Sequence, residues 1–439
     1  MERIETSPAR GMKDYLPAEA ALRDWMLEVI LETYTSRGFQ RIETPALENL
    51  ERLIGSGGGE NEKLIFKVLK RGEKLELSGS DENALADLGL RFDLTVPLAR
   101  YWAHNQPKLP PVFRAIQIGP VWRAERPQRG RFRQFLQCDI DIVGEPSVLA
   151  EMELIAVSVE VARKLGVKAP VLRFNDRRFL DAVLGWAGVP ADVGGAVLVA
   201  LDKLDKIGQE GVLAEIGRLE LEGSVTGRLA RFVAESSAGE QLPAGLFKEI
   251  GLAEEVVGDM EAIASLAGCS AMAGTALVFD PTVIRGMGYY TGPIYELGVA
   301  ELGFSIGGGG RYDEMLGRFG RPAPACGFSL GFERISLYLH EQGAHGALVA
   351  PELHLRIASA ADYPAALAMA ERAVARGVRA SVEGASKKLG AVIRHLREER
   401  AGVVAAPRSW VAVAELSKGE LTVHDLTGNT PDLGWLQES

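Results

Sequence analysis

Apolar residues in the first part of the chain follow two different periods. From Ala18 to Arg37 they recur every three or four positions, which predicts an amphipathic helix, and Gly38 supplies its stop. Apolar segments at 112–122 and 134–143 instead predict strands. Helical spacing returns at 150–165. This part of the chain is therefore predicted to combine helices with a sheet.

The pattern changes again in the middle of the chain. Between residues 176 and 270, Ala, Leu, Val, Glu and Gly at helical spacing predict a helical insertion. Strand and glycine patterns resume at 276–310, and a helix is predicted at 333–342. Short apolar strands, predicted at 354–358, 403–405, 411–413 and 421–424, then alternate with helices, which predicts a small α/β domain. The predicted division is one domain in two parts (1–172 and 273–342), an insertion (173–272), a linker (343–351) and a last domain (352–439).

Two shorter patterns also carry predictions. Residues 62–70 and 74–77 predict a hairpin that turns at Arg71-Gly72. The segment RFDLTVPLAR predicts a strand with Asp93 and Thr95 on one face, which ends near Pro97.

Composition limits the class of protein. The chain has 439 residues, of which 47% are hydrophobic and 25% charged, as in ordinary globular domains. No stretch reaches the roughly 18 apolar residues of a membrane span, and the charged N-terminus lacks a signal-peptide core. The three cysteines form no ligand set, so we expect a cytoplasmic protein and assign no metal ligands. The net charge of −10 argues only weakly against nucleic acid, because local basic patches decide phosphate contact.

An arginine-rich segment carries the most informative chemistry. In VWRAERPQRGRFRQFLQCDIDIVG the arginines lie between two predicted strands, and their planar donors suit phosphate oxygens. An arginine cluster alone is more often a solvated surface. Here, however, Gln137, Asp139 and Asp141 alternate along the next strand and therefore project from one face. Such a pattern favours a nucleotide bound beside a zwitterionic substrate.

Two glycine-containing segments add to this picture. VIRGMGYYTGPIYE has one arginine before paired tyrosines, and GGGGRYDEMLGRFGRP precedes ACGFSLGFERI. The glycine run is not a P-loop, because no Gly-Lys-Ser/Thr follows, and it lacks the spacing of a dinucleotide fingerprint. Its physical use is close approach of the backbone to a ligand.

Together these segments resemble the histidyl-tRNA synthetases, a family of class II aminoacyl-tRNA synthetases. The arginine-rich segment resembles motif 2, GMKDYLP with IETPALE resembles motif 1, and FERI resembles motif 3. VIRGMGYYTG resembles a motif peculiar to the histidine enzymes, although Gly288 stands where the family usually has aspartate. The resemblance implies an α+β fold: an antiparallel sheet flanked by helices, a helical insertion, and a C-terminal α/β domain of the anticodon-binding type.

The resemblance also implies roles for individual residues. ATP binding falls to Arg123, Glu125, Arg131, Phe135 and Arg334. Histidine binding falls to Asp93, Thr95, Gln137, Asp141, Arg285, Tyr289, Tyr290, Gly308 and Tyr312. Arg123 and Arg285 are the implied electrostatic catalysts, and the implied contacts to the tRNA acceptor end are Arg126, Gln128 and Arg129.

The implied activity is ligation of histidine to tRNA(His) by way of histidyl-adenylate, with ATP and Mg²⁺, in a homodimer built around Pro45. The basic segment SKKLGAVIRHLREER favours RNA contact and a solvated helix face about equally. Three alternatives stay open from the sequence. They are a regulatory paralogue such as the non-catalytic subunit of ATP phosphoribosyltransferase, an enzyme that adenylates histidine for another acceptor, and a plain nucleotide-binding module.

Overall fold

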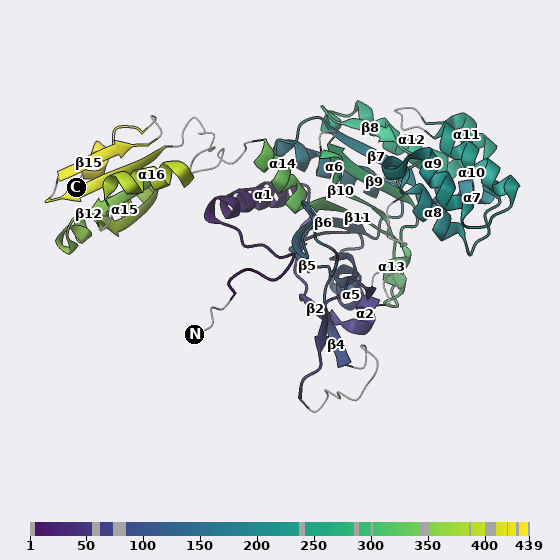
Figure 1. Cartoon of the computed structure of the whole chain (residues 1–439), viewed down its shortest axis with the longest axis horizontal. Helices are drawn as coiled ribbons and strands as arrows, with labels where there is room; N and C mark the ends of the chain where they lie inside the picture. The colour runs from purple at the N-terminus through teal and green to yellow at the C-terminus, as the bar shows by residue number, and fades with distance from the viewer. Residues whose placement is uncertain are drawn as a thin grey trace. The chain divides into compact units, whose positions relative to one another are not determined.

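The structure is a computed structural model, and the chain forms two compact units (Figure 1). The first unit comprises Met1–Lys13 and Glu28–Ile335, and the second comprises Asp14–Leu27 and Ser336–Ser439. The structure describes residues 5–54, 62–72, 85–236, 242–284, 289–299, 302–342, 351–385, 388–399, 410–418, 420–426 and 430–437.

The first unit is built on one large sheet. Its described strands follow the order β1-β5-β6-β11-β10-β9-β7-β8. Neighbours pair antiparallel except at the two edges, where β1 with β5 and β7 with β8 are parallel. The sheet therefore has the predicted antiparallel character. The bounds are β1 Gln40–Ile42, β5 Phe113–Trp122, β6 Gln134–Val143, β7 Pro170–Asp176, β8 Ala276–Phe279, β9 Pro293–Val299, β10 Ser305–Arg311 and β11 Ala325–Gly331.

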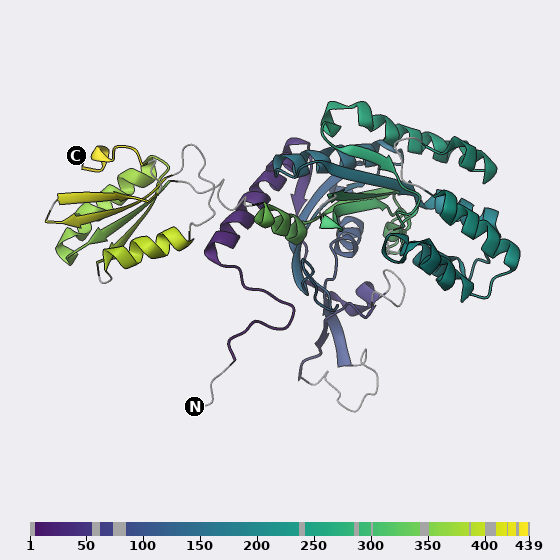
Figure 2. The same ribbon diagram turned by 45° about the horizontal axis from the view of Figure 1, so that its top comes forward.

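Helices pack along this sheet, and Figure 2 shows the strands with the helices around them. Helix α6 (Leu149–Lys164) contacts β6 and β11, and α12 (Glu254–Ser265) contacts β7 and β8. In β6 the apolar side chains of Cys138, Ile140 and Ile142 are fully buried. Because side chains alternate along a strand, the polar residues between them face the other side of the sheet.

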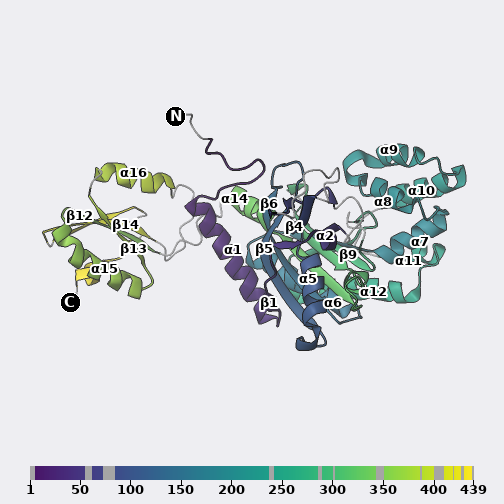
Figure 3. The same ribbon diagram turned by 90° about the horizontal axis from the view of Figure 1, so that it is seen from below.

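The insertion between β7 and β8 is helical, as predicted, and Figure 3 shows several of its helices grouped together. Asp176 is the last residue of β7. Its side chain caps the first of these helices by accepting a hydrogen bond from the backbone N–H of Arg178 (2.8 Å). The predicted boundary after residue 172 thus falls inside β7. The helices before α12 are α7 Arg177–Ala187, α8 Gly194–Leu201, α9 Leu204–Gly217, α10 Gly223–Glu235 and α11 Ala244–Glu249.

A smaller sheet of the first unit has the order β2-β4-β3 among the described residues. Strand β3 pairs antiparallel with β4, whereas the expected partner segment 74–77 lies outside the described residues. The bounds here are β2 Leu47–Asn49, α2 Leu50–Ile54, β3 Lys67–Leu69, β4 Ala86–Leu90 and α5 Thr95–Asn105.

The prediction of a strand through Asp93 and Thr95 is wrong. Helix α5 begins at Thr95, and Asp93 Oδ1 accepts a hydrogen bond from the backbone N–H of Val96 (3.2 Å). Pro97 lies within the first turn, where its missing N–H leaves no helical hydrogen bond unmade. Pro97, which was predicted to end a strand, is therefore compatible with the first turn of a helix.

The second unit contains a four-stranded sheet in the order β13-β12-β14-β15. Strand β12 pairs parallel with β13 and β14, and β15 pairs antiparallel with β14. Its elements are β12 Glu352–Ile357, α15 Tyr363–Ala375, β13 Arg379–Gly384, α16 Leu389–Glu399, β14 Val411–Ser417 and β15 Glu420–Asp425. The predicted α/β alternation is present, and the strand predicted at 403–405 lies outside the described residues.

Three further α-helices lie among the described residues, in addition to short 3-10 helices. They are α1 Pro17–Ser36, α13 Glu314–Gly317 and α14 Phe332–Glu341. No helix in the described ranges has both the length and the apolar character needed to cross a bilayer.

Candidate active site

A cavity of about 300 Å³ opens in the first unit, and most of the predicted site residues line it. Its walls come from β6, β10 and β11, from the segment between β5 and β6, and from the starts of α5 and α14. The predicted residues that it brings together are Asp93, Thr95, Arg123, Glu125, Arg131, Phe135, Gln137, Asp141, Tyr289, Tyr290, Gly308, Tyr312 and Arg334. Arg285 and Gly288 lie outside the described residues.

One end of the cavity is acidic, and we call it the acidic end: Asp93, Gln137, Asp139, Asp141 and Tyr312. Strand alternation projects Gln137, Asp139 and Asp141 into the cavity, where they are only 8%, 5% and 3% exposed. Burial, together with neighbouring carboxylates, raises the pKa of Asp139 to about 7 and that of Asp141 well above its usual value. This end therefore concentrates carboxyl groups whose ionised forms the surrounding protein only partly stabilises.

Asp93 is held in place through the backbone on either side of it. Arg123 Nε donates to the carbonyl oxygen of Phe92 (2.9 Å), and Gln117 Nε2 donates to that of Leu94 (2.8 Å). Burial raises the pKa of Asp93 to about 6, against the opposing effects of the Val96 N–H and the Arg123 charge. Asp93 Oδ2 is buried and accepts no hydrogen bond from any described residue.

Tyrosines form a wall beside the acids. The Tyr312 hydroxyl donates to Asp141 Oδ1 (2.5 Å), and its ring centre lies 6.1 Å from that of Tyr289. Tyr289 and Tyr290 have ring centres 4.9 Å apart. Burial raises the pKa values of Tyr289 and Tyr312 well above the usual value, so both hydroxyls stay protonated at neutral pH. The wall can thus contact a flat ring while Asp141 offers it a hydrogen-bond acceptor.

Glycines in β10 and β11 allow this close packing. A Cβ atom on Gly309 would lie 1.9 Å from the carbonyl oxygen of Gly327, and one on Gly327 would lie 2.1 Å from Asp141 Oδ1. Any larger residue at either position would push apart the strands or displace the carboxylate. Gly309 therefore lets β10 approach β11 closely, and Gly327 leaves room for the Asp141 carboxylate. The predicted approach of the glycine run to a ligand stays a prediction.

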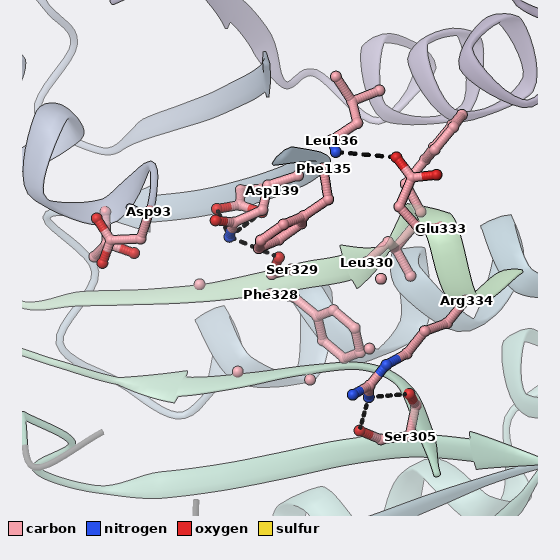
Figure 4. Close-up of a pocket in the computed structure, with 18 of the residues that line it drawn as sticks. Asp93, Phe135, Leu136, Asp139, Ser305, Phe328, Ser329, Leu330, Glu333 and Arg334 are labelled. Carbon is pink, nitrogen blue, oxygen red and sulfur yellow. Dashed lines mark hydrogen bonds between the residues drawn. The ribbon is translucent and has the colours of Figure 1, made fainter. Parts of the chain in front are cut away.

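The other end of the cavity, which we call the cationic end, comprises Arg123, Glu125, Arg131, Phe135 and Arg334. The Arg123 guanidinium carbon lies 5.1 Å from the centre of the Phe135 ring, and Arg131 forms an ion pair with Glu125. Arg334 donates to the carbonyl oxygen of Ser305 (2.7 Å), as Figure 4 shows. Guanidinium groups beside an aromatic ring suit a phosphate-bearing ligand with a flat base.

Helix α14 joins this end to β6. Glu333, in its first turn, accepts a hydrogen bond from the backbone N–H of Leu136 (3.2 Å; Figure 4). This contact fixes the start of α14, and with it Arg334, against the strand that carries the acids. Both residues lie at the start of the helix predicted at 333–342, but only Arg334 had a predicted role.

Asp139 and Ser329 also line the cavity, although neither was among the residues predicted to bind histidine or ATP. Asp139 belongs to the alternating pattern, so the same signal that picked out Asp141 marks it too. Ser329 lies directly opposite Asp139 in the pairing of β11 with β6 and lines the cavity. Its position depends on strand register, which a single serine among glycines does not reveal.

The three residues expected to contact tRNA lie in a turn between β5 and β6, and none of them lines the cavity. Arg126, Gln128 and Arg129 are exposed. The turn is closed by hydrogen bonds between the backbones of Gln128 and Arg131 (3.0 and 2.9 Å), with Gly130 at φ +69°. This places exposed side chains next to the cationic end.

Metal ligands are not clustered in the part of the chain that the structure describes. There, no three His, Cys, Asp or Glu side chains are arranged to hold a metal ion.

Comparisons with known proteins agree with this geometry. The family model described as histidyl-tRNA synthetase matches residues 11–335. A histidine–tRNA ligase from Leifsonia xyli subsp. xyli is 50% identical over 345 residues, which cover 75% of this chain and 79% of the relative. One from Phocaeicola vulgatus is 33% identical over 95% of this chain and 94% of the relative.

Among solved structures, a histidyl-tRNA synthetase from Nostoc sp. PCC 7120 superposes with a TM-score of 0.77 at 25% identity, and the match covers 98% of this chain and 96% of that one. Sequence, fold and cavity therefore agree, and the chain belongs to the histidyl-tRNA synthetase family.

Proposed function

We propose that this chain is a histidine–tRNA ligase, which activates L-histidine with ATP and transfers it to the 3′ end of tRNA(His). The observation that carries this proposal is a single cavity with an acidic, tyrosine-walled end and a cationic end. Family membership supports the same activity.

The acidic end would bind the amino acid. Asp93 Oδ2 and Gln137 Oε1 are buried acceptors without a partner among the described residues. Leaving such atoms unpaired costs about 1–3 kcal/mol each, and an α-ammonium group would remove that cost. The imidazole would then lie beside Tyr289 and Tyr290 and donate to Asp141, with Thr95 and Gly308 completing the walls.

The cationic end would bind ATP. Arg123 and Arg131 would contact the phosphates, and the adenine would lie between Phe135 and Arg334, with Glu125 near its amino group. Mg²⁺ would accompany the phosphates rather than occupy a preformed protein site, as it usually does with nucleotide substrates.

In the first step, a histidine carboxylate oxygen attacks the α-phosphorus of ATP, and the bond to pyrophosphate breaks. Arg123 would stabilise the charge that grows on the α-phosphoryl oxygens, so catalysis is mainly orientation and preorganised electrostatics. Arg285 is proposed from sequence for the same task. In the second step, a hydroxyl of the terminal adenosine attacks the adenylate carbonyl, and AMP leaves.

Several finer features belong to the same proposal. Arg126, Gln128 and Arg129 would contact the acceptor end, since they are exposed beside the cationic end. The domain from residue 352 would bind the anticodon, and on α16 the exposed Arg394 and Arg397 are candidates for its backbone contacts. A cytoplasmic homodimer with Pro45 at its interface is the expected assembly.

The alternatives are less favoured. A regulatory paralogue or a plain nucleotide-binding module has no need for the combined acidic and cationic ends. An enzyme that adenylates histidine for another acceptor would share the cavity, but the similar proteins are named histidine–tRNA ligases.

Two assays on the purified chain test the proposal in sequence. We expect histidine-dependent exchange of labelled pyrophosphate into ATP, followed by charging of a tRNA(His) transcript. Exchange without charging would favour the adenylating enzyme. The absence of both would contradict the proposal.

A further inference from the structure

The side-chain amide of Gln137 is held on one side only. Its Nε2 atom lies 3.2 and 3.4 Å from the two carboxylate oxygens of Asp139 and 3.2 Å from Ser329 Oγ. Figure 4 shows these contacts around the labelled Asp139 and Ser329. The nitrogen end of the amide therefore has its partners within the protein.

The oxygen end of the same amide has no partner among the described residues. Gln137 Oε1 is buried and accepts no hydrogen bond from any described residue, and Gln137 lines the cavity. The same holds for Asp93 Oδ2 across the acidic end. Two buried acceptors that have no partner in the described part of the chain, both in one cavity, suit a ligand group that carries several N–H donors.

A half-turn of the Gln137 side-chain amide exchanges the positions of its nitrogen and oxygen atoms. The neighbouring groups therefore determine which of the two orientations is stable. A carboxylate only accepts hydrogen bonds, and it therefore selects the orientation with Nε2 toward it. Ser329 supports this choice: its hydroxyl donates to Asp139 and its oxygen accepts from Gln137 Nε2. The strand register sets Ser329 opposite Asp139, so the three side chains form a closed set.

We propose that Asp139 is a positioning residue for histidine binding. With Ser329, it locks the Gln137 amide so that Oε1 faces the cavity and accepts a hydrogen bond from the α-ammonium group of the substrate. Asp139 acts through Gln137 and does not take part in phosphoryl transfer. This inference rests on the proposed function and names how one of its binding contacts is set.

The orientation of the Gln137 amide depends on the protonation state of Asp139. Asp139 selects the amide orientation only while ionised, because a protonated carboxyl group could also donate to Oε1. Burial, with a contribution from Asp93, raises its pKa to about 7. The titratable or charged groups that act on it or feel its charge are Asp93, Asp141, Arg123, Arg91 and Tyr34.

The test uses the full chain and pyrophosphate exchange. We expect Asp139→Asn to raise KM for histidine by about tenfold, because asparagine accepts either amide orientation, while KM for ATP stays within about twofold. Ser329→Ala should have a smaller effect in the same direction. The matched control Asp181→Asn, on the exposed side of α7, should leave all constants unchanged.

A double-mutant cycle separates positioning from a general structural effect. In a Gln137→Ala background, Asp139→Asn should change KM for histidine by less than about twofold, because the residue that it positions is gone. The Tm of Asp139→Asn should not be lower than that of the wild-type chain, since the substitution removes a buried charge.

The positioning role of Asp139 and the proposed function can fail separately in these experiments. An unchanged histidine KM in Asp139→Asn, or the same tenfold effect with and without Gln137, would overturn the positioning role. In either case the wild-type exchange would still support the proposed function. No histidine-dependent exchange by the wild-type chain would overturn both.

Discussion

The two ends of the cavity share strand β6 but differ in how they are built. The acids are almost wholly buried, with Asp139 only 5% exposed, and hydrogen bonds from Gln137, Ser329 and Tyr312 hold them. The arginines are more open: the Arg131 side chain is 46% exposed and pairs with Glu125. A buried, prearranged end suits selection of one small substrate, whereas an open end suits a larger nucleotide and passage of the tRNA end.

The largest effect should come from the cationic end. Arg123→Ala should lower kcat for pyrophosphate exchange by roughly 10²–10³, because it removes a preorganised charge from the developing phosphoryl oxygens. KM for histidine should also rise, since Arg123 holds the Phe92 carbonyl next to Asp93. Arg163→Ala, on the exposed face of α6, is the matched control. A kcat within a few-fold of wild type would remove Arg123 from the mechanism.

Substitutions at the acidic end should mainly change KM for histidine. Asp93→Asn should raise KM for histidine by roughly 100-fold, because the substrate ammonium loses a buried ionised partner. KM for ATP should change little, which steady-state exchange at varied ATP would measure. Asp87→Asn, exposed on β4, serves as the control. An equal rise in both KM values would mean that the two ends do not divide the substrates.

The exposed turn should matter only in the second step. Arg129→Ala should lower the rate of tRNA(His) charging by about threefold, as loss of one phosphate contact does, and leave exchange unchanged. Charging and exchange rates measured on the same preparation check this. If exchange fell in parallel with charging, the turn would belong to the activation site instead.

The smallest effect concerns stability and pH in the substrate-free chain. Burial raises the pKa of Asp93 to about 6 and that of Asp139 to about 7 in the folded chain. Between these values and the lower pKa of the same groups in the unfolded chain, the folded chain binds more protons than the unfolded chain. The free energy of unfolding should therefore rise as pH falls from about 8 to about 5.5 on account of these groups.

Thermal unfolding checks this by comparing variants across that pH range. The wild-type chain should gain about 2 °C in Tm relative to Asp139→Asn as the pH falls, because the variant lacks one of the two carboxyl groups. A difference that stays constant with pH would contradict a raised pKa at Asp139.

Strands β5 and β6, and the side chains that β6 carries into the cavity, could be predicted from the sequence. Strand β6 was predicted with its observed bounds, because alternation of polar and apolar residues is a local signal, and it placed Gln137 and Asp141 on one face. The roles came from resemblance to a family, since arginines and tyrosines alone are compatible with a surface or a core.

The rest depended on information that is not local. Asp93 was assigned to a strand, because nothing in RFDLTVPLAR separates a strand end from a helix start. Ser329 gained its place only from the register of β11 on β6. The orientation of the Gln137 amide depends on both neighbours at once, so it could not be read from the chain before the fold was known.

The central claim is that the acidic end recognises the ammonium group of histidine beside the ATP site. Pyrophosphate exchange with histidine and with deaminohistidine, which keeps the imidazole and the reacting carboxylate, tests it most directly. The account predicts a kcat/KM roughly 100-fold or more lower for deaminohistidine, with Asp93→Asn largely abolishing the difference. Equal exchange with both compounds in the wild-type chain would contradict it.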